Sequence, residues 1–358
     1  MGQAERDTFI IGRDDGILVT GGTGFIGSRL VEVLLDRGFR NLRCLVRSSS
    51  GLDRVKDLCG RCPEGARVDV VRGNLLSRED CTAATRDVAV VFHLAAARGE
   101  KSVPDAFMNS VVTTRNLLEA SLGHQCLRRF VNVSSFTVYA NVHKSRRRLL
   151  DESCPVEPHP ELRGDAYCFA KVKQEEIVSE YGKRFGIPYV MVRPGHVYGP
   201  GNEGLTGRVG INTFGVFLHL GGSNPLPLTY VDNCAEAIAL AGLKKLATSA
   251  EVFNVVDDDL PSSRRFLRLY KQNVRRFKSI YVPHFLSYTF SYLWERYSTW
   301  SDGQLEPVFN RRRWHATWKK TTYSNVRLKT SLGWTPKVSM KEGMSSYFES
   351  CRDRERDA

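Results

Sequence analysis

The sequence predicts an α/β fold in which a doubly wound parallel sheet, covered by helices on both faces, is joined to a smaller C-terminal lobe. Two observations support this prediction. Short apolar runs alternate with stretches of helical spacing through the first two thirds of the 358 residues. The alternation then stops near residue 195, apart from one late apolar run. Because parallel strands are buried on both faces, they read as continuous apolar runs of this kind.

The predicted strands are runs rich in Val, Leu, Ile and Phe, at 17–20, 42–46, 68–71, 88–94, 130–133, 189–192 and 252–256. Helical spacing is clearest at 26–35, 107–122 and 170–185. A strand at 251–256 is expected to return to the sheet. The chain is expected to divide into a sheet domain, a smaller lobe and two tails, at 15–200, at 201–250 with 257–350, and at 1–14 and 351–358.

Composition is ordinary for a globular protein, with 42% hydrophobic and 25% charged residues. The nine cysteines are scattered and odd in number, and the N-terminus is polar rather than an apolar leader. We therefore expect reduced thiols in a cytoplasmic protein. Cys59 and Cys62 form a lone CxxC in a stretch that contains Gly and Pro, which favours a loop over a metal site.

Positive charge is concentrated late in the chain. The net charge is +13, and residues 261–320 hold thirteen Lys and Arg against three acidic residues, a net charge of +10. Such a segment favours an anionic substrate, an anionic membrane surface or nucleic acid, with a solvated basic face as the plain alternative. No recognised nucleic-acid motif accompanies it, so nucleic acid is not expected as a partner.

An aromatic, nearly uncharged run at 279–294 lies between the basic clusters. The run is shorter than a membrane-spanning helix, and Pro283 and His284 interrupt it. Two interpretations remain open. The run is either a helix that packs over a cleft or a patch that makes peripheral contact with an anionic membrane.

A glycine-rich motif, Thr20 to Gly27, directly follows the first predicted strand and opens a helix. Gly21 suits the tight turn, Gly24 lets the backbone approach a pyrophosphate, and Gly27 allows close contact between helix and strand. The helix N-terminus offers N–H groups to phosphate oxygens. Strand, turn and helix all fall where dinucleotide binding requires them, which predicts a Rossmann domain.

The second predicted strand ends at a position that distinguishes NAD from NADP. An NAD site has an acidic residue there that accepts from the ribose 2′-hydroxyl, whereas an NADP site has a cation. This strand ends in Arg47 and Ser48, with no acid before Asp53. The sequence therefore favours NADP over NAD, with stacking of Arg47 on adenine as the alternative role.

A tyrosine just ahead of the helical stretch predicted at 170–185 and a lysine within it, Tyr167 and Lys171, are four residues apart, as residues one helical turn apart would be. They therefore lie on one face, where the ammonium lowers the pKa of the phenol. Such a phenol can exchange a proton with a substrate oxygen while hydride moves to or from nicotinamide. Ser134 and Ser135, at the end of an earlier predicted strand, can supply a hydroxyl that holds the reacting oxygen.

Together these motifs resemble the extended short-chain dehydrogenase/reductases, the NAD-dependent epimerase/dehydratase family, from residue 17 to 348. Further matching motifs are Gly73-Asn74-Leu75, His93 to Ala97, Asn109 ahead of a helix, Arg193 to Pro200, Tyr230 to Asn233 and Leu332 to Pro336. The resemblance implies a homodimer that pairs through the helices at 107–122 and 170–185.

Site residues follow from the resemblance position by position. It implies that Ser135, Tyr167 and Lys171 are catalytic, with Ser135 preferred to Ser134 because Phe136 to Tyr139 follow it as in the family. Lys171 would also hold the nicotinamide ribose. The implied cofactor contacts are Gly21, Gly24, Phe25, Ile26 and Gly27 at the pyrophosphate, Asn74 and Leu75 near adenine, and Leu94, Ala95 and Pro194 in the cleft. No metal is expected.

Two departures from the family pattern bear on the reaction. Sugar-nucleotide dehydratases carry an Asp-Glu pair after the catalytic hydroxyl, where this chain has Phe136 and Thr137, so we do not expect dehydration. His196 replaces an Asn that is common in nucleotide-sugar epimerases. This variant resembles dihydroflavonol reductases and 3β-hydroxysteroid dehydrogenases. His196 either contacts a substrate phosphate or caps the cleft, and Arg98, Arg208 and Arg311–Arg313 are further candidate anion contacts.

The leading hypothesis is reversible hydride transfer at a secondary alcohol or ketone of a sugar or nucleotide-sugar, by an epimerase or oxidoreductase. The alternative is NADPH-dependent reduction of a lipophilic ketone, which Arg47, His196 and the aromatic run favour. A third class, a non-catalytic cofactor sensor or nucleic-acid binder, is disfavoured because both Tyr167 and Lys171 are present.

Overall fold

A computed structural model describes the chain at 8–47, 64–96, 102–142, 149–213, 215–301, 304–305 and 309–357. Cys59, Cys62, Ser48 and Arg98 lie outside these residues, so the predictions made for them are not followed further.

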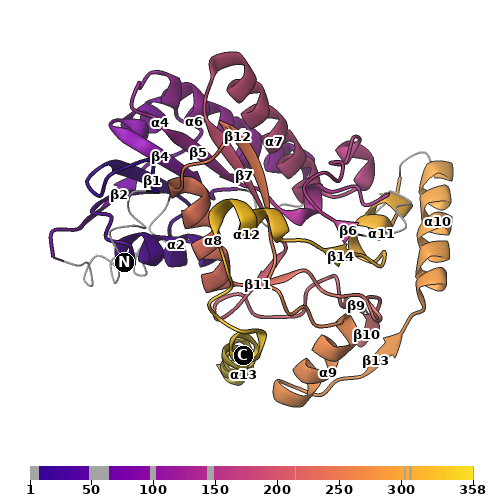
Figure 1. Ribbon diagram of the computed structural model, residues 1–358. Coiled ribbons are helices and arrows are strands. Elements are labelled where there is room, and N and C mark those ends of the chain that lie inside the picture. The colour runs from indigo at the N-terminus through magenta and orange to yellow at the C-terminus, as the bar shows by residue number, and fades with distance from the viewer. Residues whose placement is uncertain are drawn as a thin grey trace.

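A seven-stranded parallel sheet forms the centre of the molecule, in the order β12-β7-β5-β4-β1-β2-β3 (Figure 1). The strands are β1 (Gly16–Thr20), β2 (Asn41–Val46), β3 (Arg67–Arg72), β4 (Val88–His93), β5 (Arg129–Val133), β7 (Tyr189–Pro194) and β12 (Ala250–Val255). All seven predicted strands are confirmed, and so is the fold class. The late strand β12 returns to the sheet beside β7, as expected.

Helices cover both faces of the sheet. On one face, α2 (Phe25–Asp36) packs beside α8 (Val231–Leu243); on the other lie α4 (Arg78–Thr85), α6 (Thr113–Leu122) and α7 (Ala166–Phe185) (Figure 1). Successive strand residues alternate between the two layers. Ile17 and Val19 join the core under α2 and α8, whereas Leu18 joins the core under α6 and α7.

Two predicted helices begin earlier than their apolar spacing indicates. The helix expected at 170–185 starts at Ala166, because Asp165 caps its N-terminus by accepting a hydrogen bond from the Cys168 amide. Ahead of α6, the chain is already helical in α5 (Val103–Ala106) and the π-helical turn η1 (Phe107–Val112). The earlier start of α7 places Tyr167 in its first turn.

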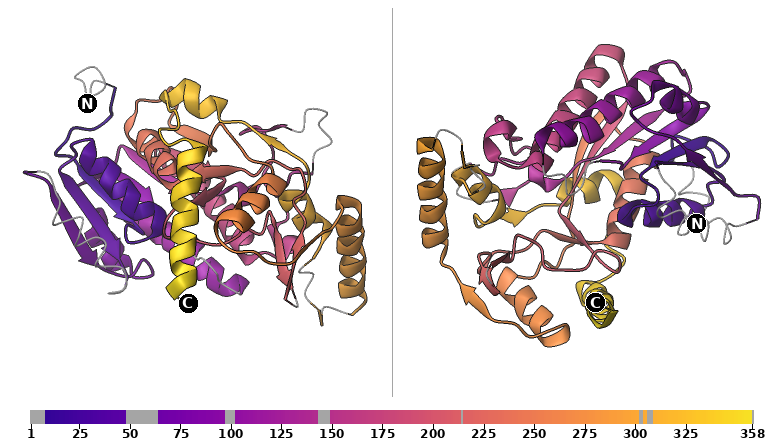
Figure 2. Two further views of the ribbon diagram at one scale, coloured as in Figure 1. Left: turned by 90° about the horizontal axis from the view of Figure 1, so that it is seen from below. Right: turned by 180° about the vertical axis from the view of Figure 1, so that it is seen from behind.

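The remaining elements form short sheets and helices beside the main sheet (Figure 2). The strands are β6 (Leu149–Leu150) with β14 (Thr322–Tyr323), β8 (His196–Tyr198) with β11 (Leu228–Tyr230), and β9 (Gly210–Thr213) and β13 (Ser279–Tyr281) on either side of β10 (Val216–His219). The helices are η2 (Phe136–Val138), η3 (Pro160–Arg163), α9 (Ser263–Asn273), α10 (His284–Trp300), α11 (Arg311–Thr317), α12 (Val326–Leu332) and α13 (Met340–Asp357).

The division into a sheet domain and a smaller lobe stays a prediction. Several segments, however, pack against the sheet although they fall outside the range predicted for the sheet domain. Helix α8 falls within 201–250 yet belongs to the layer that covers the sheet, and its residues are almost all buried. A helix that is apolar all round is typical of such burial. Phe9 and Ile11, from the expected N-terminal tail, and Cys351, from the expected C-terminal tail, are buried in the same core.

A buried ion pair fastens α7 to the sheet. Arg193 on β7 donates to both carboxylate oxygens of Glu175 on α7, from Nε at 2.8 Å and from Nη2 at 2.5 Å. The same guanidinium donates to the Tyr139 hydroxyl at 3.0 Å, which in turn donates to Asn254 on β12. Helix α7 is thereby held against three separate segments.

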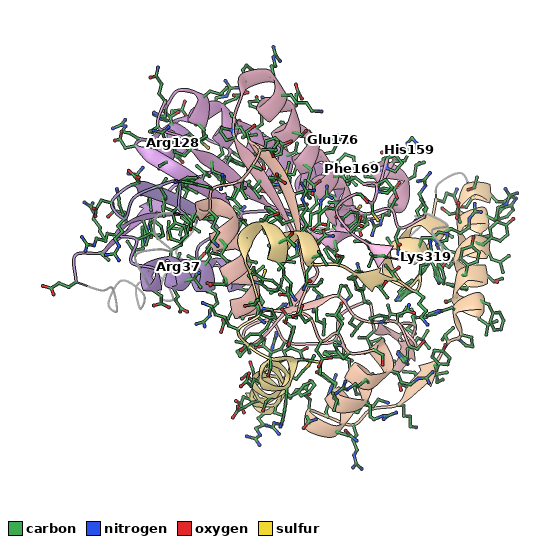
Figure 3. The ribbon with its side chains drawn as sticks, in the orientation of Figure 1. Arg37, Arg128, His159, Phe169, Glu176 and Lys319 are labelled. Carbon is green, nitrogen blue, oxygen red and sulfur yellow. The ribbon has the colours of Figure 1, made fainter. Side chains whose placement is uncertain are left out.

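We predict that Glu175→Ala lowers the free energy of unfolding by about 3–5 kcal/mol, because it leaves the Arg193 charge buried without its carboxylate. Glu176→Ala is the matched control, since the neighbouring carboxylate lies on the outer face of α7 (Figure 3) and pairs with Lys173. Its loss should cost less than about 1 kcal/mol. Urea unfolding measures both, and equal losses would contradict the assigned role of the pair.

Candidate active site

A pocket of 760 Å³ lies at the carboxyl ends of the central strands, where the sheet order reverses between β1 and β4. Open α/β sheets bind ligands at such a switch point. The sequence-predicted residues that line it are Gly21, Gly24, Phe25, Ile26, Gly27, Arg47, Asn74, Leu75, Leu94, Ala95, Ser135, Tyr167, Lys171, Pro194 and His196. The structure therefore brings residues from widely separated stretches of the sequence to one pocket.

The glycine loop has no room for side chains. Gly21 has a φ of +73°, and a Cβ added at Gly27 would come within 2.1 Å of the Gly21 carbonyl oxygen. A Cβ at Gly24 would approach the same oxygen at 3.1 Å. Helix α2 begins after Gly24 with no side chain capping its N-terminus and no acidic residue in its first turn. These features fit a loop that accepts a pyrophosphate.

At the far end of the pocket, Arg47 is exposed and donates from Nη1 to Asn109 Oδ1 at 3.4 Å. Asn74 forms a local turn in which its side-chain oxygen accepts from the Leu76 amide at 3.1 Å. None of the described residues that line the pocket is an Asp or a Glu. The lining is therefore compatible with an anionic ligand.

Both serines at the end of β5 reach the pocket. Ser135 caps the short helix η2 by accepting from the Thr137 amide at 3.2 Å. Ser134 is almost fully buried, and its hydroxyl has no hydrogen-bond partner among the described residues. Ser135 is only half-buried, so of the two serines it is the better placed to contact a ligand.

Tyr167 enters the pocket from the first turn of α7. That turn is tied to the segment after Ser135 by Arg163, which donates to the Thr137 carbonyl and, at 3.1 Å, to the Cys168 sulfur. The Arg163 carbonyl in turn accepts from Asn310 at 2.8 Å. These bonds fix the start of α7 relative to η2, and so the tyrosine relative to Ser135.

Lys171 is 3% exposed. Its ammonium donates to the Val133 carbonyl at 2.7 Å and to Gln174 Oε1 at 2.9 Å. Burial lowers the pKa of Lys171 to about 8, and the nearby Glu175 carboxylate opposes that shift. An ammonium has three protons, so one remains for the pocket that Lys171 lines.

A chain of buried hydrogen bonds connects Lys171 to the glycine loop. Gln174 Nε2 donates to Thr114 Oγ1 at 2.7 Å, and Thr114 Oγ1 lies 2.9 Å from His93 Nε2. His93 Nδ1 lies 2.8 Å from Thr20 Oγ1, at the end of β1. Burial, with a smaller effect of Lys171, lowers the pKa of His93 to about 3, so the imidazole is neutral at physiological pH.

The partners determine which nitrogen of His93 carries the proton. Thr114 donates its one hydroxyl proton to the Ser110 carbonyl at 2.5 Å, so its oxygen must accept from His93 Nε2. His93 Nδ1 then accepts from Thr20, whose oxygen accepts from the Ala95 amide at 3.3 Å. Every member of this chain is therefore satisfied, which holds Lys171 and the glycine loop in one rigid arrangement.

Sequence reasoning missed Arg163, Gln174, Thr114 and the role of His93. Gln174 could have been found, because it lies one helical turn from Lys171 on the same helix face. Arg163 and Thr114 carry no signal in a single sequence, since their partners are distant along the chain.

Arg47 and His196 line the pocket, but the other described arginines that were predicted to contact a substrate anion do not. Arg208 is not among the lining residues, and its guanidinium donates to the carbonyls of Ala316 and Thr317. Arg311 pairs with Glu295 at 2.9 Å and Arg312 pairs with Glu157 at 2.7 Å. Arg313 donates to the Gly164 carbonyl at 3.2 Å. These arginines make contacts within the protein instead.

The sheet, the glycine loop and the Tyr-Lys helix define the class of this protein. Residues 17–255 match the NAD dependent epimerase/dehydratase family, and the chain belongs to it. A relative, 3β-hydroxysteroid-dehydrogenase/decarboxylase isoform 1 of Arabidopsis thaliana, is 24% identical over 93% of this chain and 79% of its own length.

Solved structures share the fold over nearly their whole length. The crystal structure of gox2253 matches with a TM-score of 0.75 and 22% identity, covering 96% of this chain and 99% of that one. The UDP-glucose 4-epimerase of Thermus thermophilus in complex with NAD matches with a TM-score of 0.65 and 25% identity, covering 94% and 98%.

We predict that the Lys171 side chain titrates near pH 8 rather than near its ordinary pKa of 10.5. Because the unfolded chain holds this proton more tightly, the free energy of unfolding should rise with pH between those values. The ¹³Cε resonance of labelled lysine reports the titration, and its loss in Lys171→Arg assigns it. A resonance that titrates near 10.5 would show that the ammonium is solvated.

Proposed function

We propose that this protein is an NAD(P)-dependent oxidoreductase that transfers hydride at a secondary alcohol or ketone. The observation that supports it best is the meeting of Ser135, Tyr167 and Lys171 with the glycine loop in one pocket. A proton donor, a lysine and a dinucleotide cradle in one cavity are the groups that such a reaction needs.

The dinucleotide, when bound, supplies or accepts the hydride. In the reduction, Tyr167 gives its phenolic proton to the carbonyl oxygen of the substrate as that oxygen becomes an alcohol. The Ser135 hydroxyl donates a hydrogen bond to the same oxygen and holds it beside the phenol. In the oxidation, the Tyr167 phenolate takes the alcohol proton. A reduction followed by an oxidation therefore restores Tyr167, whereas a net reduction requires the phenolate to take a proton from solvent before the next turnover.

Lys171 has two tasks in this proposal. Its ammonium stabilises the phenolate that Tyr167 becomes after giving up its proton. Its third proton, not used by Val133 or Gln174, bonds to the ribose next to the nicotinamide. The buried chain through Gln174, Thr114 and His93 keeps the ammonium in place for both tasks.

NADP is the proposed cofactor. Arg47 stands at the end of β2, where the ribose 2′ position of a dinucleotide would lie, and no described lining residue is acidic. A carboxylate there would repel the 2′-phosphate, whereas a guanidinium attracts it.

The two residues that follow Ser135 argue against a built-in dehydration step, although the family includes dehydratases. Phe136 is buried and stacks on Tyr323, and the Thr137 carbonyl accepts from Arg163. Expulsion of water needs an acid and a base beside the reacting carbon, and these two positions provide neither. We therefore propose proton and hydride transfer without dehydration.

For the substrate, we favour a lipophilic secondary alcohol or its ketone. Three of the candidate contacts for a substrate anion, Arg208, Arg311 and Arg312, make contacts within the protein and do not line the pocket. The Arabidopsis relative acts, by its name, on a 3β-hydroxysteroid. A nucleotide-sugar is the second candidate, because the Thermus thermophilus structure with the same fold is a UDP-glucose 4-epimerase.

We predict that Tyr167→Phe lowers turnover by about 10²–10⁴-fold, because it removes the proton donor, and leaves cofactor binding unchanged. Tyr181→Phe is the control, since this tyrosine lies on the same helix and bonds to Glu119 outside the pocket. The assay uses sterol 3β-alcohols with NADP⁺, followed by cofactor absorbance, and UDP-sugars, followed by chromatography of the products. If the Tyr167→Phe protein turned over either group of substrates at the wild-type rate, the assignment of Tyr167 as proton donor would be refuted.

We also predict that Arg47→Gln weakens NADPH binding by about 10–100-fold and NADH binding far less, because only NADPH carries the 2′-phosphate. Cofactor fluorescence measures both dissociation constants. Arg115→Gln serves as the control, since its guanidinium pairs with Glu119 away from the pocket. An equal change for both cofactors would mean that Arg47 contacts the adenine instead.

A further inference from the structure

Helix α10 exposes large apolar side chains on its outer face and buries several serines on its inner face, which is unusual for a surface helix. The side chains that it turns toward the protein include three buried serines, Ser287, Ser291 and Ser298. Each serine is satisfied locally: Ser287 accepts from the Trp314 indole at 2.9 Å, Ser291 donates to the Ser287 carbonyl, and Ser298 donates to the Leu305 carbonyl. Half-buried Tyr288 and Trp294 lie beside these serines and pack on Trp314 and Phe309, so the inner face combines small polar and aromatic side chains.

The outer face of α10 carries those large side chains instead. They are exposed, and from Leu286 onward they recur at intervals of three and four residues, so they form one stripe along the helix that begins beside Phe285 and continues through Leu286, Phe290, Leu293, Tyr297 and Trp300. Trp300 is 77% exposed and Phe285 is 69% exposed. Ile280 and Tyr281 on the preceding strand β13 are exposed as well. A soluble surface helix normally has the opposite arrangement.

We call this stripe, with Ile280 and Tyr281, the α10 surface. Helix α10 stands at the outer edge of the molecule in both Figure 1 and Figure 2, and no residue of α10 lines the pocket. The interpretation of 279–294 as a helix packed over a cleft is therefore not supported for this pocket. Among the described residues, Phe309 contacts Phe290 and Arg264 contacts Tyr281, yet every side chain of the α10 surface is 45% or more exposed.

Basic residues surround the α10 surface. Arg296 is exposed on α10 itself, and Arg311 lies over the Tyr292 ring at 5.0 Å while it pairs with Glu295. Arg264 lies over the Tyr281 ring at 5.4 Å, and Lys278 directly precedes β13. Residues 261–320 carry a net charge of +10. A partner that matches this surface therefore has an apolar interior for the exposed aromatic and leucine side chains and an anionic exterior for the surrounding Arg and Lys.

We propose that the α10 surface docks this enzyme onto an anionic lipid bilayer. The aromatic and leucine side chains enter the boundary between headgroups and acyl chains, and the surrounding Arg and Lys meet anionic headgroups. No helix within the described residues is long and apolar enough to cross a bilayer. The contact is therefore one in which α10 lies on the membrane surface.

A second copy of this chain fits the surface less well. A symmetric contact through this surface would bring the basic residues of both copies, among them Arg264 and Arg296, into one interface, and like charges held close in an interface disfavour association. The pairing that the family resemblance implies uses α6 and α7 instead. A bilayer with anionic headgroups satisfies both the apolar stripe and the charges.

The surface is coupled to the proposed active site through a short series of contacts. Trp314 on α11 bonds to Ser287 of α10, and Asn310, which caps α11, bonds to the Arg163 carbonyl ahead of α7. Tyr167 lies in the first turn of that helix. A membrane contact at α10 would thus be connected to the start of the helix that carries Tyr167, although the docking does not depend on the substrate class.

The test is co-sedimentation of the full-length protein with vesicles of phosphatidylcholine alone or mixed with phosphatidylserine, without substrate. We expect binding to the mixed vesicles, weaker binding at high salt, and little binding to phosphatidylcholine alone. Leu293→Ser with Trp300→Ser should lower the partition coefficient at least about tenfold. Val326→Ser with Leu122→Ser, which removes exposed apolar side chains elsewhere, is the matched control and should bind like wild type.

Absence of wild-type binding to the mixed vesicles would overturn the proposal, as would equal losses in the two double variants. So would a Leu293→Ser, Trp300→Ser protein that changes its oligomeric state on size exclusion while its vesicle binding stays at the wild-type level. Tyr167→Phe should bind vesicles normally. Loss of turnover and loss of docking are therefore measured separately, and one proposal can fail without the other.

Discussion

The burial of one charged side chain, Lys171, organises the site. An ammonium that is 3% exposed loses most of its hydration, and this cost must be offset by direct partners. The Val133 carbonyl and Gln174 provide them, and each belongs to an element that is itself fixed: Val133 to the centre of the sheet and Gln174 to α7. The lysine can therefore occupy one position, at the wall of the pocket.

The surrounding structure consists largely of devices that keep α7 and β5 in register around that lysine. Arg193 and Glu175 fasten the middle of α7 to β7, and Arg163 fastens its first turn to the segment after Ser135. The chain from Gln174 through His93 extends the arrangement to the end of β1, where the glycine loop begins. Lys171, which is proposed for both cofactor binding and proton transfer, is thus joined by one polar network to the start of the glycine loop.

Local patterns predicted most of the fold and the lining of the pocket. Apolar runs determine the strands, and a loop that must approach phosphate tolerates only glycine, so Gly21, Gly24 and Gly27 could be recognised from spacing alone. The structure also placed Tyr167 and Lys171 on one helix that reaches the pocket, as their spacing indicates. These features depend on neighbours within a few residues.

What could not be predicted depends on distant partners. The charge of Arg208 is ordinary in the sequence, and its contacts with Ala316 and Thr317 exist only after folding. Helix α8 was expected to belong to the smaller lobe because it comes late in the chain, but it is buried against the sheet. The orientation of α10 could not be predicted either. Its aromatic content is also typical of a core helix, and only the structure shows that its serines are buried and that many of its aromatic side chains are exposed.

The central claim is that the glycine loop and the Tyr167–Lys171 pair serve one bound dinucleotide. A crystal structure of the protein with NADPH tests it most directly. The account predicts a pyrophosphate against Gly24 to Ile26, the Lys171 ammonium within hydrogen-bond distance of a ribose hydroxyl, and the reactive nicotinamide carbon beside the Tyr167 oxygen. A dinucleotide bound elsewhere, or bound here with its nicotinamide directed away from Tyr167, would contradict the account.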